Sequence, residues 1–161
     1  MEKHKQKLSQ DAALLDKYLG RYNCCRNRKK VLERRKNELT REFENPLAAV
    51  RLDGMPRGSS RGVGCAALSF QIDEINTRIG EKIKEMEKKY VEINDVIEFL
   101  PENSTERTII EYKYIDGYRW AEICQLEHIT RTPAVQYWRK GLYQLLEFAK
   151  VQQVVRDFKN E

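Results

Sequence analysis

The sequence predicts an all-α protein, in which a long antiparallel helical hairpin of the coiled-coil type precedes a small helix-turn-helix domain. Two long segments repeat apolar side chains at spacings of three and four residues. Charged residues make up 34% of the chain against 40% hydrophobic residues, and only four prolines interrupt the 161 residues. This composition suits long helices with narrow apolar seams better than one large core.

The first long helix is expected to begin at Ser9 or Asp11, either of which can cap it, and to end before Pro46. Gly20 lowers helix propensity and predicts fraying or a bend in the first turns. The seam of this helix has a period near 3.5, weakened by two lysines. Its members are Leu15, Tyr18, Tyr22, Cys25, Lys29, Leu32, Lys36, Leu39 and Phe43.

The second long helix is expected over residues 64–100, ending before Pro101. A helix of this length with a single apolar stripe needs a partner helix. The first helix is the nearest partner, and dimerisation through the same seam, which would give a homo-oligomer, is the alternative. The stripe consists of Leu68, Ile72, Ile75, Ile79, either Ile83 or Lys82, Met86, Tyr90, Ile93, Ile97 and Leu100.

Residues 46–64 form a basic connection that holds four of the eight glycines and two of the four prolines. Gly, Pro and Ser at this density predict a loop. The loop is either simply solvated or an arm that touches phosphates. We therefore expect one domain over residues 1–100, with this loop inside it, and a second domain over residues 101–161.

Charge is distributed unevenly along the chain. Residues 1–45 carry a net charge of +6, residues 64–100 carry −3 and residues 128–161 carry +3. Basic ends of this kind can bind a polyanion. The run 26–36 holds seven basic residues and one acidic residue, and it can either contact DNA or complement the acidic second helix.

Several classes of protein are not expected. The chain lacks an apolar stretch of about 18 residues, so no membrane association is predicted. Its four cysteines form no C-x-x-C unit and only two histidines are present, which argues against a metal site, a disulfide framework or a bound cofactor and favours the reducing cytosol. No P-loop or Ser/His/Asp set is present, so we do not expect an enzyme.

Three shorter helices are expected after Pro101. Ser104 or Thr105 can cap the first, which is broken at residues 116–117, and residues 120–126 form the second. After a brief connection, the third begins at Thr130 or Thr132 and continues to Phe148. A short connection between the last two helices is typical of a helix-turn-helix unit.

The third helix has one apolar face, and both tryptophans of the domain are expected to pack in its core. Trp120 lies in the second helix and Trp138 in the third. Because core packing explains both side chains, stacking on unpaired bases is not expected for them. The inward residues of the third helix are Ala134, Trp138, Leu142 and Leu145.

The stretch Tyr114–Leu126 resembles the region-four helix-turn-helix of bacterial sigma factors, which has a tyrosine-rich helix end, an acidic-Gly step, an aromatic residue and then Glu-Ile-Ala. Ile129–Arg131 looks like the Ile-Ser-Arg that opens the recognition helix of that family, and Gly141 falls at its usual small alanine. Cys124 and His128 depart from the pattern, since they stand where the family has Ala and a turn Gly. Pro133-Ala134 replaces the usual Thr-Val.

The motif Leu52–Gly58, followed by a long helix and such a module, is similar to the RinA- and ArpU-like late activators of phages of Gram-positive bacteria. This resemblance implies a transcription regulator that binds double-stranded DNA in the cytoplasm of the bacterial host. It also implies that the protein activates phage late genes together with host RNA polymerase.

In a helix-turn-helix module the last helix enters the major groove of DNA. Arg131 can pair with a guanine and Gln136 with an adenine edge, whereas Arg139 and Lys140 are expected to meet phosphates. No carboxylate occurs within residues 128–143. The full set of expected DNA-binding residues is Arg131, Thr132, Val135, Gln136, Arg139 and Lys140 on the last helix, and Tyr118 and Arg119 before the second helix.

A second function is open to a chain of this kind. It is a coiled-coil interaction adaptor, in which the small helical end domain binds protein and not DNA. The length of the seam and the neutral sum of charges over residues 101–161 favour this alternative.

Overall fold

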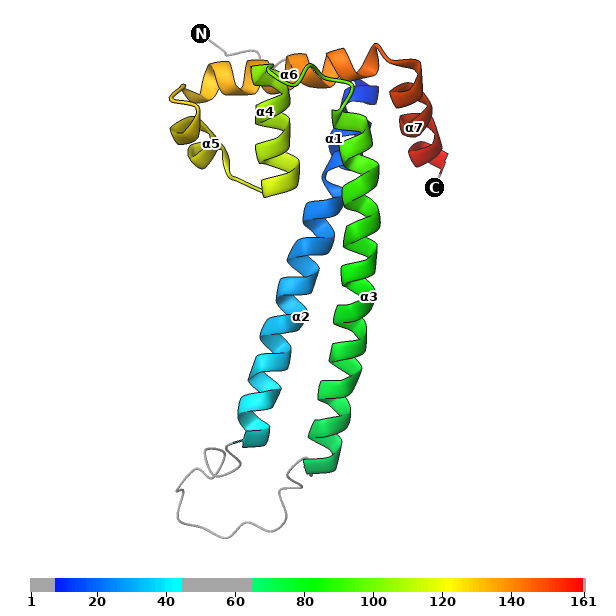
Figure 1. Ribbon diagram of the computed structural model, residues 1–161, viewed down its shortest axis with the longest axis vertical. Coiled ribbons are helices and arrows are strands. Elements are labelled where there is room, and N and C mark those ends of the chain that lie inside the picture. The colour runs from blue at the N-terminus through cyan, green and yellow to red at the C-terminus, as the bar shows by residue number, and fades with distance from the viewer. Residues whose placement is uncertain (1–7, 45–64, 161) are drawn as a thin grey trace. The chain divides into compact units, whose positions relative to one another are not determined.

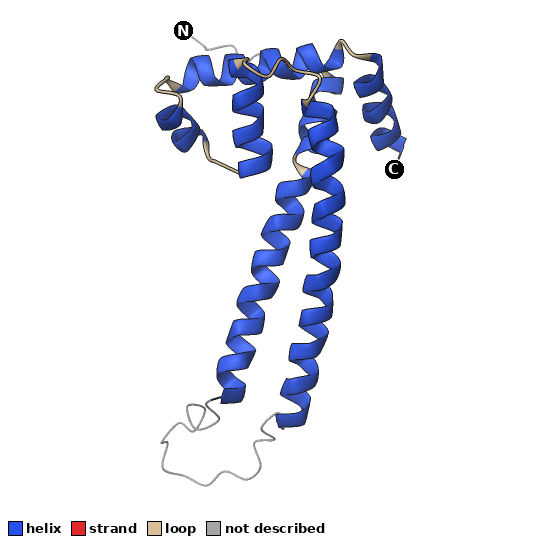
Figure 2. Ribbon diagram, viewed as in Figure 1, coloured by secondary structure: helices blue, strands red, loops and turns tan. Residues whose placement is uncertain are grey.

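The computed structural model describes residues 8–44 and 65–160, and every regular element in this part of the chain is helical (Figure 2). The predicted all-α fold class is confirmed. Figure 1 labels the α-helices, which are α1 (Gln10–Leu19), α2 (Arg21–Glu44), α3 (Cys65–Ile97), α4 (Thr105–Glu111), α5 (Trp120–Leu126), α6 (Arg131–Leu146) and α7 (Ala149–Asn160). The π-helical segment η2 (Tyr112–Asp116) follows α4 directly. None of the described helices has the length and apolarity needed to cross a membrane.

The loop expected over residues 46–64 lies outside the described residues, and so does the motif at residues 52–58. The sequence predicts fraying or a bend at Gly20, and the first long helix is interrupted there. Helix α1 ends at Leu19 and α2 starts at Arg21. Gly20 caps α1 by donating its N–H to the carbonyl oxygen of Asp16 over 3.0 Å.

Serine side chains cap two of the predicted helices. The Oγ of Ser9 accepts the N–H of Ala12 at 3.2 Å, and the Oγ of Ser104 accepts the N–H of Arg107 at 3.2 Å. Each bond satisfies one of the backbone donors that a helix leaves open at its start. Gly117 ends the helical run with φ 74°, a conformation in which glycine has no steric penalty.

The chain divides into two compact units, which differ from the expected boundary at residue 100. Unit 1 combines the chain up to Cys24 with the chain from Glu87 onward, and unit 2 spans Cys25–Met86. The boundaries therefore fall inside α2 and α3. The difference has a physical cause, since α1 packs against α6 and α7 and so belongs with the later helices.

Unit 1 contains the hydrophobic core. Its buried members come from α1, the end of α3 and every later element of the chain. Helix α7 was not predicted as a separate element, yet its Val151 and Val155 are buried in this core. The core consists of Leu15, Tyr18, Leu19, Ile93, Val96, Ile97, Leu100, Ile109, Ile110, Tyr114, Ile123, Trp138, Leu142, Leu145, Val151 and Val155.

Contacts between α2 and α3 are found near the boundary of the units. In unit 1 the Arg21 guanidinium lies 3.2 Å from the Glu92 carboxylate, and the rings of Tyr22 and Tyr90 are 5.6 Å apart. In unit 2 the Cys25 Sγ donates to Glu85 over 3.3 Å. A coiled-coil hairpin that continues over the whole length of both helices stays a prediction.

Helices α4 and α6 approach closely at Gly141. A Cβ placed on this glycine would lie 2.6 Å from Cδ1 of Ile110 and 3.2 Å from Cβ of Glu106. Ile110 is fully buried, so its side chain has little room to move away. A residue with branches on Cβ therefore does not fit at this position.

We therefore expect Gly141→Val to destabilise unit 1 by about 1–3 kcal/mol, because overpacking pushes α4 and α6 apart. Thermal unfolding followed by circular dichroism measures this change. Ala121→Val, at an exposed position of α5, serves as the control and should change the stability by less than about 0.5 kcal/mol. An equal effect of the two variants would contradict the close approach.

Candidate nucleic-acid interface

Helices α5 and α6 are joined by a turn of four residues, and they contact each other and α4 or η2 in unit 1. The N–H of Ile129 donates to the carbonyl oxygen of Cys124 over 3.1 Å and fixes this turn. Within it, His128 has φ 52°, a conformation that favours glycine. Thr130, not Thr132, is the N-cap residue of α6.

The inward face of α6 consists of the residues expected there. Ala134, Leu142 and Leu145 are fully buried, and Trp138 is 7% exposed. The ring of Trp120 meets that of Trp138 edge-on, with centroids 5.8 Å apart. The predicted core position is confirmed for Trp138, whereas Trp120 is only partly buried and packs against the edge of the core.

The outer face of α6 carries three polar side chains of the predicted DNA-binding set, and all three are exposed: Arg131, Thr132 and Gln136. The first turn of the helix contains no acidic residue, so its positive dipole end is not compensated within the turn. Arg139 is half-buried. Val135 is also half-buried and packs against the core, which differs from its expected outward position.

Lys140 is exposed but already holds an ion pair within the protein. Its Nζ lies 2.6 Å from Oε1 of Glu106 on α4. The hydrogen bond from Lys140 lowers the pKa of the Glu106 carboxyl, against the opposing effect of burial, and the same bond raises the pKa of Lys140. This pair ties α4 to α6 and compensates part of the positive charge that was expected to meet phosphate.

Tyr118 and Arg119 are exposed before α5, as their predicted role requires. The backbone N–H of Arg119, however, donates to Oε2 of Glu122 over 2.6 Å. A carboxylate therefore occupies the start of α5. Its negative charge disfavours a phosphate at these N–H groups, so any phosphate contact here depends on the Tyr118 and Arg119 side chains.

A chain of hydrogen bonds connects α6 to α1, and it runs from the buried Trp138 to the partly exposed Asp16. Nε1 of Trp138 donates to the Tyr114 hydroxyl over 2.8 Å, and that hydroxyl donates to Oδ1 of Asp16. Burial, reinforced by the negative charge of Asp16, raises the pKa of Tyr114 far above its usual value. The tyrosine thus stays neutral and keeps the proton that it donates.

Lys113 sits beside this chain, with its Nζ 4.1 Å from the centroid of the Trp138 ring, 4.7 Å from that of Trp120 and 4.0 Å from Oδ1 of Asp16. Burial lowers the pKa of Lys113, although the Asp16 charge acts in the opposite direction. The lysine therefore supports the inner side of α6 through cation–π contacts.

Sequence reasoning did not find these supporting residues. Asp16 and Tyr114 are 98 positions apart, and Glu106 and Lys140 belong to different helices, so periodicity gives no link between them. The one available signal was Trp138, since the N–H of a buried tryptophan needs an acceptor.

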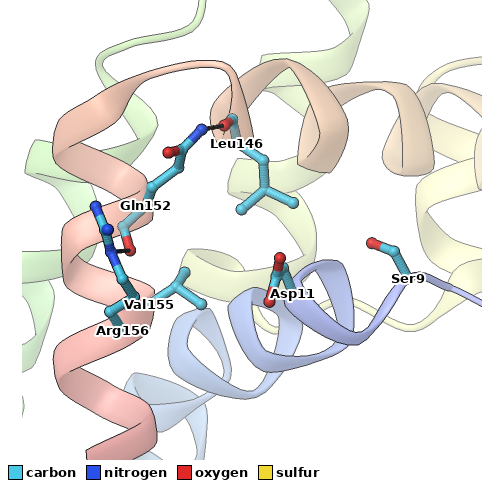
Figure 3. Close-up of a pocket in the computed structure, with 6 residues that line it drawn as sticks. All are labelled: Ser9, Asp11, Leu146, Gln152, Val155 and Arg156. Carbon is cyan, nitrogen blue, oxygen red and sulfur yellow. Dashed lines mark hydrogen bonds between the residues drawn. The ribbon is translucent and has the colours of Figure 1, made fainter.

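A surface pocket lies elsewhere in unit 1, between α1, the end of α6 and α7 (Figure 3). Inside it, Nε2 of Gln152 donates to the carbonyl oxygen of Leu146 over 2.7 Å, and Nε of Arg156 donates to that of Gln152 over 3.4 Å. None of the predicted DNA-binding residues lines it; the residues that do are Ser9, Asp11, Leu146, Gln152, Val155 and Arg156.

Residues 8–44 and 65–160 contain no cluster of three acidic, His or Cys side chains that could hold a metal ion.

We expect Tyr114→Phe to lower the free energy of unfolding by about 1–3 kcal/mol, because it leaves the Trp138 N–H without its acceptor in a buried site. Chemical denaturation followed by tryptophan fluorescence measures the loss. Tyr90→Phe removes a hydroxyl from a side chain that is 41% exposed and should be nearly neutral. If both variants unfold like the wild type, the hydrogen-bond chain does not stabilise the unit.

The Glu106–Lys140 pair predicts a pH dependence of stability in the acidic range. Because the folded-state pKa of Glu106 lies below its ordinary value of 4.5, the contribution of the ionised pair is present above that value. It is lost as the pH falls through the lowered pKa. The difference in Tm between wild type and Glu106→Gln should therefore be largest near pH 7 and shrink below about pH 4.5. A difference that is constant with pH would contradict the ion pair.

No protein-family model, no curated protein and no solved structure matches the chain. The sigma-like and RinA- or ArpU-like resemblance therefore rests on the motifs alone.

Proposed function

We propose that this protein is a sequence-specific DNA-binding regulator of transcription, with α6 as the helix that enters the major groove. The observation that carries the proposal is the outer face of α6. Arg131, Thr132 and Gln136 are exposed there, while the opposite face is buried in the core. A helix with exposed polar side chains on one face and no acidic residue in its first turn suits contact with a polyanion.

The proposed contacts divide into two kinds. Arg131 and Gln136 have the donor groups that read guanine and adenine edges in the major groove. Arg139, Tyr118 and Arg119 contribute contacts to the DNA backbone, which position the helix without reading sequence. Lys140 makes a weaker contribution to this second group, because the nearby Glu106 carboxylate already compensates part of its charge.

The support from unit 1 is structural as well as electrostatic. The Tyr114 and Lys113 contacts hold the Trp138 side of α6 from beneath. A helix whose inner face is fixed in this way presents its outer side chains in a constant orientation, and this lowers the entropic cost of binding DNA. The half-buried Val135 adds apolar packing at the first turns of the helix.

The proposal also includes a context, which derives from the motif resemblance. In that context the protein acts in the cytoplasm of a bacterial host, on phage late genes, with host RNA polymerase as its partner. The competing proposal is a coiled-coil adaptor that binds protein only. It is supported by the exposure of apolar side chains of α3 in unit 2. DNA selection separates these two proposals.

The decisive experiment selects bound sequences from a random double-stranded DNA library with the full chain. Wild-type protein should enrich one common motif. For that motif, Arg131→Ala and Gln136→Ala should each raise the Kd about 5- to 150-fold, the range expected for one bidentate base contact. Their affinity for random DNA of equal length should change less, because phosphate contacts remain.

Arg156→Ala is the matched control, since Arg156 is an exposed arginine of unit 1 outside the helix-turn-helix. It should leave both the selected motif and its affinity unchanged. Failure to enrich any motif, or an equal effect of all three variants on every DNA sequence, would contradict sequence-specific binding through α6 and favour the adaptor.

A further inference from the structure

The described part of unit 2 has almost no core of its own. Among residues 25–44 and 66–86, only Cys25 and Leu32 are buried, whereas the core of unit 1 has 16 buried members. Helices in proteins owe most of their stability to the tertiary packing of an apolar face. Two long helices with two buried side chains between them are therefore poorly supported by a single chain.

The uncovered apolar surface is concentrated on α3. Its stripe keeps a regular spacing of three and four residues, yet Ile83 is 38% exposed and no member of the stripe within unit 2 reaches full burial. Phe70, outside the stripe, is 71% exposed. The members of the stripe in this unit are Leu68, Ile72, Ile75, Ile79, Ile83 and Met86.

Helix geometry indicates which flank of the stripe is open. Glu85 contacts Cys25 of α2, and Lys82 lies within electrostatic reach of Arg28, so these two residues mark the flank that faces α2. At about 100° per residue, Gly80 lies about 140° from Glu85 and about 160° from Lys82 around the helix. Gly80 and the exposed Ile83 therefore belong to the flank turned away from α2.

Gly80 gives this flank a second distinctive property. It is an interior residue of the 33-residue helix α3, where glycine is the least favourable residue after proline. Within the described chain nothing requires it, since no heavy atom lies within 4 Å of the position that its Cβ would occupy. A glycine in such a place is suited to the close approach of another backbone.

The charges of unit 2 favour a second copy of the same chain as the occupant. Residues 25–44 of α2 carry a net charge of +4, and residues 65–86 of α3 carry −1. In a two-fold dimer the same patch must complement itself. A pair of helices with opposite charge and one open apolar flank meets this condition, because α2 of each copy can lie on α3 of the other.

We propose that unit 2 is a homodimer interface, in which the flank of α3 around Gly80 and Ile83 packs against the second copy to complete a four-helix bundle. The bundle buries the α3 stripe that one chain leaves half covered, as the knobs-into-holes packing of such bundles does. This interface does not depend on DNA binding, and it is measured in the absence of DNA.

Sedimentation equilibrium of the full chain over a range of concentrations tests the interface. The wild type should have twice the chain mass of 19.1 kDa. Gly80→Ala adds one methyl group at the closest approach and should raise the dimer dissociation constant about tenfold or more. Gln71→Ala also raises helix propensity, but Gln71 is exposed and lies about 180° from Gly80 around α3, so the dimer should be unchanged.

Ile83→Asp provides an independent test and should yield a monomer. Near-UV circular dichroism of Trp120 and Trp138 reports whether unit 1 remains folded in this variant. If that signal is lost, Gly80→Ala alone decides the question. A wild type that stays monomeric at all concentrations overturns the proposal, as does a trimer or larger assembly. A Gly80→Ala variant that dimerises as tightly as the wild type and only gains thermal stability overturns the close approach at Gly80.

Discussion

The arrangement of unit 1 depends on the polar chain Trp138–Tyr114–Asp16. Burying an indole N–H or a hydroxyl without a hydrogen-bond partner costs free energy. Here the Trp138 N–H donates to the Tyr114 hydroxyl, and that hydroxyl donates to Asp16. The chain starts on α6, passes through the π-helical segment η2 and ends on α1. It therefore specifies which face of α6 is turned inward, a choice that apolar packing alone determines less sharply.

This orientation gives the inner and outer faces of α6 different roles. The inner face is occupied by core packing and by Lys113 beneath the tryptophan rings. One outer cation, Lys140, is held by Glu106, which braces α4 against the helix that is proposed to bind DNA. The remaining exposed groups, Arg131, Thr132 and Gln136, lie where a groove-bound helix carries its reading side chains.

The sequence was sufficient to predict whatever depends on local spacing. The caps at Ser9 and Ser104, the break at Gly117 and the inward set around Trp138 all follow from rules that act within one or two helical turns. The predictions fail where the structure depends on contacts between segments that are far apart in the sequence. The spacing of the apolar seam does not change at Gly20, so the sequence predicts that the residues of α1 belong to the hairpin. In the structure, α1 packs against α6 and α7. Helix α7 was overlooked because Val151 and Val155 stand among charged and amide side chains. The outer-face residues of α6 could be named from spacing, whereas the Glu106 pair that restrains Lys140 could not.

The discontinuity of unit 1 has a consequence for its biosynthesis. Asp16 and its partner Tyr114 are separated by 98 positions, so at roughly 5–20 residues per second the ribosome needs about 5–20 s to connect them. During that interval the apolar side of the amino-terminal helix has no docking site, because α6 and α7 are still untranslated. The helix-turn-helix can thus complete its core only after synthesis has passed α7, and premature termination anywhere before that point leaves Leu15 and Leu19 exposed to the cell's chaperones.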